Sequence, residues 1–316
     1  GDNGFENCTS LKTVQIGSKL ECINNSVFSG CENLETIGIP STVKYIKDNA
    51  FNGCKSLVKL TIPKDIKEIG IAAFKNCKLL NDISFEINSN LRIISDECFY
   101  GCSSLQIDTL PSSIISIGKM SFYECKEIKS IKFPSILKEI KNSAFKNSTK
   151  LERISMTLND KMTFTLAMKD QIKIGENPFE GCSPNIILTV DAQDYLYQNQ
   201  LFAFANITQI NINNSVCNIY KNAFKDCSNL KKVTIPNSVT YIYQHAFANC
   251  SNLEEVIIPN TVTFIEKEAF INCSSLKTIE IPVSIKKISE GCFMNCIQLE
   301  KLTIKDGVES IGKNAF

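Results

Sequence analysis

The sequence offers few residues that could carry chemistry. His245 is the single histidine, so a cysteine–histidine nucleophile pair could be built only around this residue. Cysteines four residues apart, Cys98 with Cys102 and Cys292 with Cys296, come nearest to a metal motif. A zinc site needs three or four ligands, and no second pair of ligands lies close to either pair in the sequence. We therefore predict no catalytic centre, no cofactor and no metal site.

The sequence also lacks the patterns typical of phosphate binding, acid–base catalysis, nucleic-acid binding and membrane insertion. The sequence has no glycine-rich phosphate loop, and its acidic residues are scattered among lysines as solvated charges rather than paired for acid–base work. The net charge is +1, and Arg92 and Arg153 are the only arginines among 316 residues. Nucleic-acid binding needs a clustered basic surface, and a membrane span needs a run of about 18 apolar residues. We expect no nucleic-acid partner and no insertion of this chain into a membrane.

Fifteen cysteines could indicate a disulfide framework, but their spacing argues against one. Eleven follow a phenylalanine by three residues, and Ser148 takes this place once. Equivalent residues of stacked repeats lie about 4.8 Å apart, whereas a disulfide needs Cβ atoms about 3.8 Å apart with a specific twist. We interpret these cysteines as small buried groups with weak S–H donors. They are Cys8, Cys31, Cys54, Cys77, Cys102, Cys125, Cys182, Cys227, Cys250, Cys273 and Cys296.

A repeat supplies the elements that position these residues. Thirteen phenylalanines recur, and nine of the twelve intervals between them are 23 residues. Counting each such Phe as position 0, Leu occupies position 6, Ile-like residues positions 9 and 11, and Pro position 12 in seven repeats. Apolar residues two apart predict a strand with one buried face, which Pro ends because it cannot donate to a ladder. The anchors are Phe5, Phe28, Phe51, Phe74, Phe99, Phe122, Phe145, Phe179, Phe224, Phe247, Phe270, Phe293 and Phe316.

This rhythm is typical of a leucine-rich-repeat solenoid, whose repeats are about 20–29 residues long. We predict an α/β solenoid, either a horseshoe or an elongated right-handed superhelix, of about 13 coils. A parallel β-sheet would form its concave face, and short helices or turns its convex face. Position 2 is almost always Gly, Asn or Asp, which predicts a left-handed residue that turns the chain back.

Two interruptions break the repeat. Residues 154–166 alternate apolar and polar side chains around a turn pair, which predicts a β-hairpin extension. Further on, residues 186–190 predict a strand and residues 191–206 a helix capped by its first residue. We expect one continuous solenoid that is truncated at both ends, because the repeat runs through both termini. Its parts are an N-terminal array 1–156, interrupted repeats 157–207 and a C-terminal array 208–316.

The repeat resembles that of the BspA-like, or Treponema-type, leucine-rich-repeat surface proteins. Their unit has the form Leu-x-x-Ile-x-Ile-Pro-x-Ser-Val-x-x-Ile-Gly-x-x-Ala-Phe-x-x-Cys. It is matched over nearly the whole chain, for example from Leu253 through Pro259 to Phe270 and Cys273. The resemblance implies a surface or secreted adhesin that binds host matrix proteins, host cells or other microbes. Such proteins occur in mucosal bacteria and in protozoan parasites, and the Asn- and Lys-rich composition suits a trichomonad-like member.

Side chains at positions 8 and 10 should point away from the core onto the exposed face of the sheet. We expect Ile107, at position 8 of its repeat, on this face as well. The face is polar and mostly uncharged, although Thr and Ser suit any exposed strand. A rival site is the hairpin around Lys161–Thr165, since long inserts often carry function. The candidate ligand-binding residues are Thr61, Ser84, Thr109, Lys132, Arg153, Ser155, Lys232, Thr234, Glu255 and Glu280.

The sequence favours a non-enzymatic adhesion or recognition module. It would bind a protein of the host-cell surface or extracellular matrix, or a glycan, while displayed on a cell surface or secreted. The alternative is an intracellular, cytoplasmic scaffold with the same fold and no host ligand. Asn-x-Ser/Thr sequences arise largely from the repeat itself and would be glycosylated only in a secreted chain. They begin at Asn7, Asn24, Asn147, Asn206, Asn213, Asn249 and Asn272.

Overall fold

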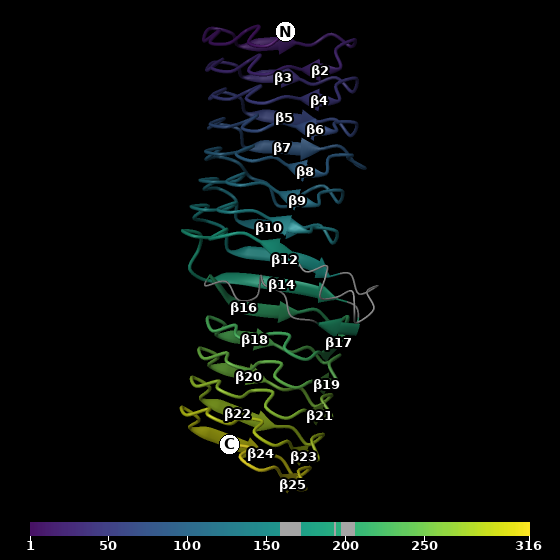
Figure 1. Ribbon diagram of the computed structural model, residues 1–316, viewed down its shortest axis with the longest axis vertical. Coiled ribbons are helices and arrows are strands. Elements are labelled where there is room, and N and C mark those ends of the chain that lie inside the picture. Colours follow the sequence, from purple (N-terminus) through teal and green to yellow (C-terminus); the bar gives the residue numbers. More distant parts are fainter. Residues whose placement is uncertain (159–171, 193, 197–205) are drawn as a thin grey trace. The chain divides into compact units, whose positions relative to one another are not determined.

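The computed structural model describes residues 1–158, 172–192, 194–196 and 206–316. Contacts group the chain into two compact units. Unit 1 is Gly1–Glu152 with Ile172–Ser183, and unit 2 is Arg153–Gln171 with Pro184–Phe316. In each unit the coils are stacked and the paired strands are parallel (Figure 1), which confirms the predicted solenoid. Nothing helical in the described residues is long and apolar enough to cross a membrane.

The main strands come from positions 8 to 11 of the repeat, where the sequence predicts them. In unit 1, Thr13 pairs with Thr36 and Lys59 with Asp82, so neighbouring strands are one 23-residue repeat apart. The five main strands of this unit are β1 (Thr13–Gln15), β3 (Thr36–Gly38), β5 (Lys59–Ile62), β7 (Asp82–Phe85) and β10 (Ser130–Phe133).

Unit 2 contains the longer run of main strands. They lie in sequence order in one parallel sheet, so each coil adds one strand beside the previous one. The seven strands are β12 (Arg153–Leu158), β14 (Ile186–Ala192), β16 (Ile207–Ile212), β18 (Lys232–Thr234), β20 (Glu255–Ile257), β22 (Thr278–Ile281) and β24 (Lys301–Ile304). The described residues of the two units contain twelve main strands, one per coil, whereas the repeat predicted about 13 coils.

A second, shorter strand forms at positions 17 and 18 of the described coils, and it was not expected from the sequence. Its second residue is a buried Ile in most coils, which places one side of this ladder on the core. In unit 1 these strands are β2 (Cys22–Ile23), β4 (Tyr45–Ile46), β6 (Glu68–Ile69), β8 (Ile93–Ile94), β9 (Ser116–Ile117), β11 (Glu139–Ile140) and β13 (Lys173–Ile174). In unit 2 they are β15 (Asp194–Leu196), β17 (Val216–Ile219), β19 (Tyr241–Ile242), β21 (Phe264–Ile265), β23 (Lys287–Ile288) and β25 (Ser310–Ile311).

The anchor phenylalanines form the centre of the core. Their rings stack from coil to coil, with centroids 5.0–5.7 Å apart in unit 1 and 4.8–5.5 Å apart in unit 2. Phe51 and Phe247, for example, are fully buried. This offset stacking is a favourable geometry for aromatic rings, so each anchor fixes the register of its coil against the next.

Of the predicted short helices or turns around the anchors, the structure has the turns, and no described residue is helical. Two residues in each coil have a left-handed backbone, one at position 2, as predicted, and one two residues before the anchor. In the coil of Phe51 these are Gly53 (φ 76°) and Asn49 (φ 56°). Left-handed residues four positions apart break the right-handed run that a helix needs, and the segment folds into consecutive turns.

The turns hold adjacent coils together through the backbone. The N–H groups of Asn49, Phe51 and Gly53 donate to carbonyl oxygens of the next coil at 2.9, 2.8 and 2.7 Å. In a helix these donors would bond within their own segment, whereas here they form a ladder parallel to the stack. The turn segments therefore contribute to register as the strands do.

The interrupted repeats differ in part from the prediction. The strand predicted over 186–190 is present as β14, but this strand extends to Ala192, so Asp191 does not cap a helix. Residues 194–196 form β15, whereas 193 and 197–205 lie outside the described residues. Of the predicted hairpin, the first arm is β12, and the turn and second arm within 159–171 also lie outside them.

Candidate functional site

The candidate site is the outward face of the main strands, which we call the sheet face and define by positions 8 and 10. Alternation along each strand separates it from the core. In β5, Lys59 and Thr61 are exposed while Leu60 and Ile62 are buried, and β22 repeats this pattern. The buried residues hold each strand in place, and the sheet face stays available to solvent.

In unit 1 the sheet face joins hydroxyl and charged groups of adjacent coils. The hydroxyl oxygens of Thr61 and Ser84 are 3.1 Å apart and form a hydrogen bond. Beside them the ammonium group of Lys59 lies 2.7 Å from a carboxylate oxygen of Asp82. The predicted residues Thr61 and Ser84 are thus brought together by the pairing of β5 with β7.

The prediction that Ile107 lies on the sheet face is wrong, since its side chain is only 7% exposed. Gln106 forms an isolated bridge with Asp82, and Thr109 forms one with Lys132. The backbone between these bridges carries one residue more than its neighbours, as in a β-bulge. The extra residue shifts Ile107 into the core, while the exposed Thr109 keeps its predicted place beside Lys132.

In unit 2 the sheet face consists of two continuous rows of side chains. The pairings of the seven strands define both rows. Ser and Thr hydroxyls, carboxamides and single charges alternate along them, with the exposed Ile257 as a large apolar member at 64% exposure. The position-8 row is Arg153, Ile187, Gln209, Lys232, Glu255, Thr278 and Lys301. The position-10 row contains Ser155, Thr189, Asn211, Thr234, Ile257, Glu280 and Thr303.

Sequence reasoning missed four members of these rows: Ile187, Thr189, Gln209 and Asn211. They fall in the 45-residue interval between anchors, yet the count still reaches them: Ile187 and Thr189 lie 8 and 10 residues after Phe179, and Gln209 and Asn211 lie where positions 8 and 10 fall when one 23-residue repeat is counted back from Phe224. The alternation with their buried neighbours in β14 and β16 is the signal that would have found them. Gln209 also donates a hydrogen bond to the Asn211 carboxamide at 3.0 Å, so these two polar groups lie together on the face.

Most charges on the sheet face are neutralised by a partner in an adjacent coil. Lys232 lies 3.5 Å from Glu255, and Glu280 lies 3.3 Å from Lys305. Lys132 and Arg153 have no ion pair with any residue that the structure describes, and both are exposed. Lys301, the last member of the position-8 row in unit 2, is likewise exposed and has no ion pair with a described residue, so these three cations are the charges of the sheet face most available to a ligand.

The cysteine ladder has a structural role. The thiol of Cys125 donates to the carbonyl oxygen of Phe99, the anchor of the preceding coil, at 3.1 Å. Eight further cysteines make the equivalent contact, and Ser148 replaces it with an O–H donor to Phe122 at 2.8 Å. All fifteen cysteines are free, as the spacing predicted. Burial raises the pKa of Cys54 and of Cys182 to about 12, so their thiols stay protonated and unreactive.

His245, the single histidine, lies on a turn and is half-buried. It lies in a left-handed turn (φ 57°) two residues before Phe247, and its side chain is only 27% exposed. Its Nε2 is 2.6 Å from a carboxylate oxygen of Glu268, and this hydrogen bond lowers the pKa of Glu268. No thiol contact is recorded for the ring, and no group of three metal-ligating side chains occurs in the described part of the chain.

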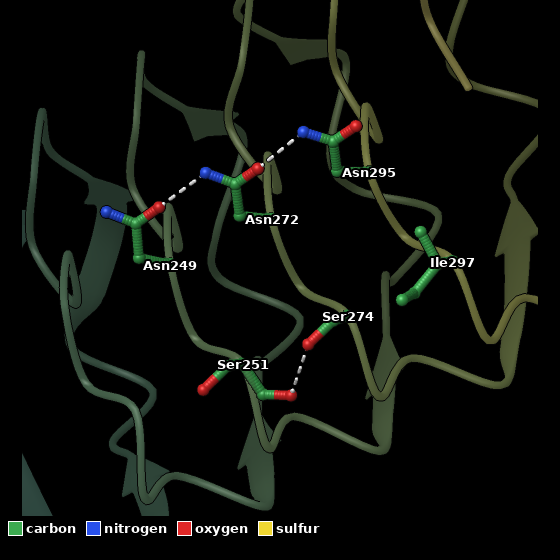
Figure 2. Close-up of a pocket in the computed structure, with 6 residues that line it drawn as sticks. All are labelled: Asn249, Ser251, Asn272, Ser274, Asn295 and Ile297. Carbon is green, nitrogen blue, oxygen red and sulfur yellow. Dashed lines mark hydrogen bonds between the residues drawn. The ribbon is translucent and has the colours of Figure 1, made fainter.

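A second polar surface lies on the turns of unit 2, in an open depression of about 380 Å³. Figure 2 shows the carboxamides of Asn249, Asn272 and Asn295 in a row, each amide nitrogen directed at the oxygen of the residue before it. The distances are 2.7 and 2.8 Å, and Asn249 donates in turn to Asp226 at 2.6 Å. Two Asn-x-Ser/Thr sequences begin at Asn249 and Asn272. The side-chain amide nitrogens of these two residues already donate hydrogen bonds within this row.

The rival hairpin site around Lys161–Thr165 lies outside the residues that the structure describes. The ten candidate residues chosen from the sequence all lie within them, at strand positions of the two units. Their assignment as ligand-binding residues stays a prediction.

Comparison with known proteins identifies the repeat. The family model described as BspA type leucine-rich repeat region (6 copies) matches residues 1–105, 83–184, 159–250 and 196–316. Among solved structures, a leucine-rich repeat protein from Bacteroides ovatus is 25% identical, with 99% of this chain and 80% of that chain covered at a TM-score of 0.48. A leucine-rich cell surface protein from Faecalibacterium prausnitzii is also 25% identical, covering 93% and 88% at a TM-score of 0.47. The pneumococcal vaccine antigen PcpA is 22% identical, covering 96% and 76% at 0.38. No curated protein matches the sequence.

Proposed function

Because the chain belongs to the BspA-type leucine-rich-repeat family, we propose that it is a non-enzymatic adhesion module. It binds a host-cell protein, a matrix protein or a glycan through the sheet face, while displayed on a cell surface or secreted. Family membership supports the general role, since leucine-rich-repeat proteins of this type act by interaction and are typically without catalysis. The ligand class and the surface used are the specific parts of the proposal.

The observation that carries the proposal is the continuity of the sheet face in unit 2. Seven neighbouring strands present hydroxyl, carboxamide and charged groups in rows one coil apart. Ile257 adds an apolar contact that is 64% exposed amid polar neighbours. An interface commonly combines such an apolar anchor with hydrogen-bonding groups around it. Seven adjacent strands spread these groups over an area that an extended protein surface can cover.

One observation favours the alternative of an intracellular interaction scaffold. Every cysteine is free, including the exposed Cys8 and the half-buried Cys22 and Cys217. Free thiols are typical of reducing compartments. Titration of thiols in protein isolated from its own cells distinguishes the two roles: cysteines protected by oxidation would support secretion, and fully reduced ones the scaffold.

The proposal is tested by reversing charges on the sheet face. Purified chain is applied to immobilised extracellular matrix proteins and to cultured epithelial cells, and the bound amount is measured against concentration. Lys132→Glu, Arg153→Glu and Glu280→Lys should each weaken binding by about tenfold if the residue contacts the ligand. Lys286→Glu is the matched control, since Lys286 is exposed but lies off the sheet face beside Glu309.

Circular dichroism and thermal unfolding must show that each variant keeps the fold. If all three sheet-face variants bind like the parent, the sheet face is not the binding surface. If the control loses as much binding as they do, the effect is one of general charge and the proposal is equally contradicted.

A further inference from the structure

A cluster of aromatic side chains lies on the second strand ladder of unit 2, away from the sheet face. We call it the aromatic patch and define it as Tyr220, Tyr241, Tyr243 and Phe264 with Glu266. Tyr241 in β19 and Tyr243, just after this strand, stand at positions 17 and 19 of their repeat, on either side of the buried Ile242. Phe264 and Glu266 hold the same positions in the next coil, and all five side chains are at least partly exposed.

Aromatic residues at these positions gather in this part of the chain. In unit 1, positions 17 and 19 of seven coils hold a single aromatic residue, Tyr45. The other coils of unit 1 place Gly, Ser, Asn, Cys, Ile or a charged residue there, so stacking of the coils does not need a ring at these positions. Phe264 is nevertheless 37% exposed. Partly exposed rings gathered in adjacent coils are a common feature of recognition surfaces.

The rings contact one another in a continuous row. The centroid of Tyr241 lies 4.3 Å from that of Tyr243 and 5.1 Å from that of Phe264, and Tyr243 lies 4.7 Å from Tyr220. The ring planes are tilted by 31–46° to one another. The strands beneath them fix this arrangement, because Tyr241 pairs with Phe264 and the adjoining Ile242 with Ile265. The row is therefore assembled before any ligand arrives.

A carboxylate is held beside the rings with part of its capacity unused. Glu266 accepts the Tyr241 hydroxyl at 3.2 Å and the backbone N–H of Gln244 at 2.7 Å. A carboxylate offers about four acceptor sites, so two remain for an incoming donor. Burial, together with Glu266, raises the pKa of Tyr241 to about 12, which keeps its hydroxyl protonated at neutral pH. Asn218, which pairs with Tyr241 in the ladder, adds a carboxamide at the edge.

We propose that the aromatic patch binds a neutral saccharide chain. A pyranose ring has an apolar face of C–H groups and a rim of hydroxyls, so it can pack on the Tyr241 and Phe264 rings while a hydroxyl donates to Glu266. A cationic ligand fits less well, because exposed Lys267 follows Glu266 and exposed Lys287 takes position 17 of the next coil. This site is independent of the proposed function of the sheet face, which uses positions 8 and 10.

The test uses the chain of residues 1–316 and a printed array of neutral oligosaccharides of glucose, galactose, mannose and N-acetylglucosamine, with sialylated counterparts. The best neutral binder is then titrated by calorimetry. Tyr241→Ala and Phe264→Ser should each weaken its affinity by about tenfold or more. Glu266→Gln, which keeps the shape of the side chain, should weaken it without unfolding the coil. Tyr45→Ala is the matched control, since Tyr45 holds position 17 of a coil in unit 1 beside Lys47.

Binding that is lost in the three patch variants and kept in the Tyr45 and Arg153→Glu variants supports the proposal. It is overturned if no neutral oligosaccharide binds, if only sialylated ones bind, or if the patch variants bind as the parent does. Loss of protein adhesion alone, without saccharide binding, would also overturn it, since the patch would then serve a protein partner.

Discussion

Gly118→Ala should destabilise the chain strongly, because position 19 of the repeat lies against the backbone of the preceding coil. A Cβ atom added to Gly118 would lie 2.5 Å from the backbone nitrogen of Asp96 and 2.5 Å from the carbonyl carbon of Ser95. Distances below 3.0 Å force these backbone atoms to move. The same contact recurs at Gly70, Gly175 and Gly312, so it belongs to the coils that have glycine at position 19, whereas other coils hold a side chain there, as at Lys47.

The cost has two parts. Over-packing of a well-packed site costs about 1–3 kcal/mol. Movement of the two coils also weakens the hydrogen bond from the Lys119 backbone N–H to the Asp96 carboxylate, which is 2.8 Å long, and a bond to a charged group contributes about 1.5–3 kcal/mol. We expect Gly118→Ala to lower the free energy of unfolding by about 2–5 kcal/mol.

Urea unfolding followed by far-ultraviolet circular dichroism measures this change. Gly38→Ala is the matched control, since a Cβ on Gly38 in β3 meets nothing within 4 Å. The control should be neutral or stabilise by up to about 1 kcal/mol, because alanine restricts the unfolded chain. Equal stability of Gly118→Ala and the parent would refute the reasoning. Complete relief of the defect by Asp96→Ala would also refute it, because this substitution removes only the carboxylate, 2.7 Å from the added Cβ, and keeps the two backbone atoms at 2.5 Å.

The remaining predictions concern the turns and the thiols. Gly53→Val should lower the thermal midpoint, since a β-branched residue is strained at φ 76°, whereas Gly38→Val should leave it nearly unchanged; midpoints within error of each other would contradict this. Cys125→Ser should cost less than about 1.5 kcal/mol and Cys125→Leu about 1–3 kcal/mol in urea unfolding, because only the second over-packs the ladder; the reverse order would count against the thiol contact. Folding raises the pKa of Cys54 and Cys182 from 9.0 to about 12, so the native state keeps protons that the unfolded state loses. Stability from these thiols should be complete below pH 9 and decline as the pH rises towards 12. The thermal midpoint of a Cys54→Ser, Cys182→Ser variant should therefore fall less between pH 9 and 12 than that of the parent, in which these two thiols add to other buried ones such as Cys227 and Cys296; an equal fall would contradict this source.

The sequence predicted the parts of the fold that recur in every coil. Phe, Leu and Ile at fixed positions mark the core, and Pro marks the end of each main strand, because burial and hydrogen bonding act on each coil alike. The left-handed residue at position 2, such as Gly53, was predicted because this position is almost always Gly, Asn or Asp. The second left-handed residue was not predicted, since Asn49, Ala72 and His245 share no chemical type. Without that residue, the segment before each anchor resembled a helix.

Contacts between coils were harder to predict than positions within a coil. The carboxylates of Asp48 and Asp96 accept the backbone N–H of Ile71 and Lys119 in the next coil, at 2.7 and 2.8 Å. The glycine before each of these donors leaves room for the approach. Such a relation joins residues 22 or 23 apart, and no pattern within one repeat shows it.

The candidate site was predictable wherever successive anchor phenylalanines are 23 residues apart. Thr61 and Ser84 lie side by side as expected, and so do Lys232 and Glu255. The bulge before Thr109 could not be placed, because one extra residue exchanges the two faces of a strand. The rows through β14 and β16 were overlooked, although positions counted forward from Phe179 and back from Phe224 reach them. The aromatic patch was also missed, since Tyr241 and Phe264 meet only once the coils are stacked.

Recognition through the sheet face is tested most directly by placing one bulky residue on it. Thr234 in β18 is exposed, and no hydrogen bond of its hydroxyl is recorded, so Thr234→Arg should leave the fold intact and obstruct a ligand. Asn260→Arg makes a comparable change on an exposed turn off the sheet face. Titration of both variants against the matrix protein or cell line that binds the parent should show binding lost in Thr234→Arg and kept in Asn260→Arg. Equal binding by the parent and a folded Thr234→Arg variant would contradict the sheet face as the binding surface.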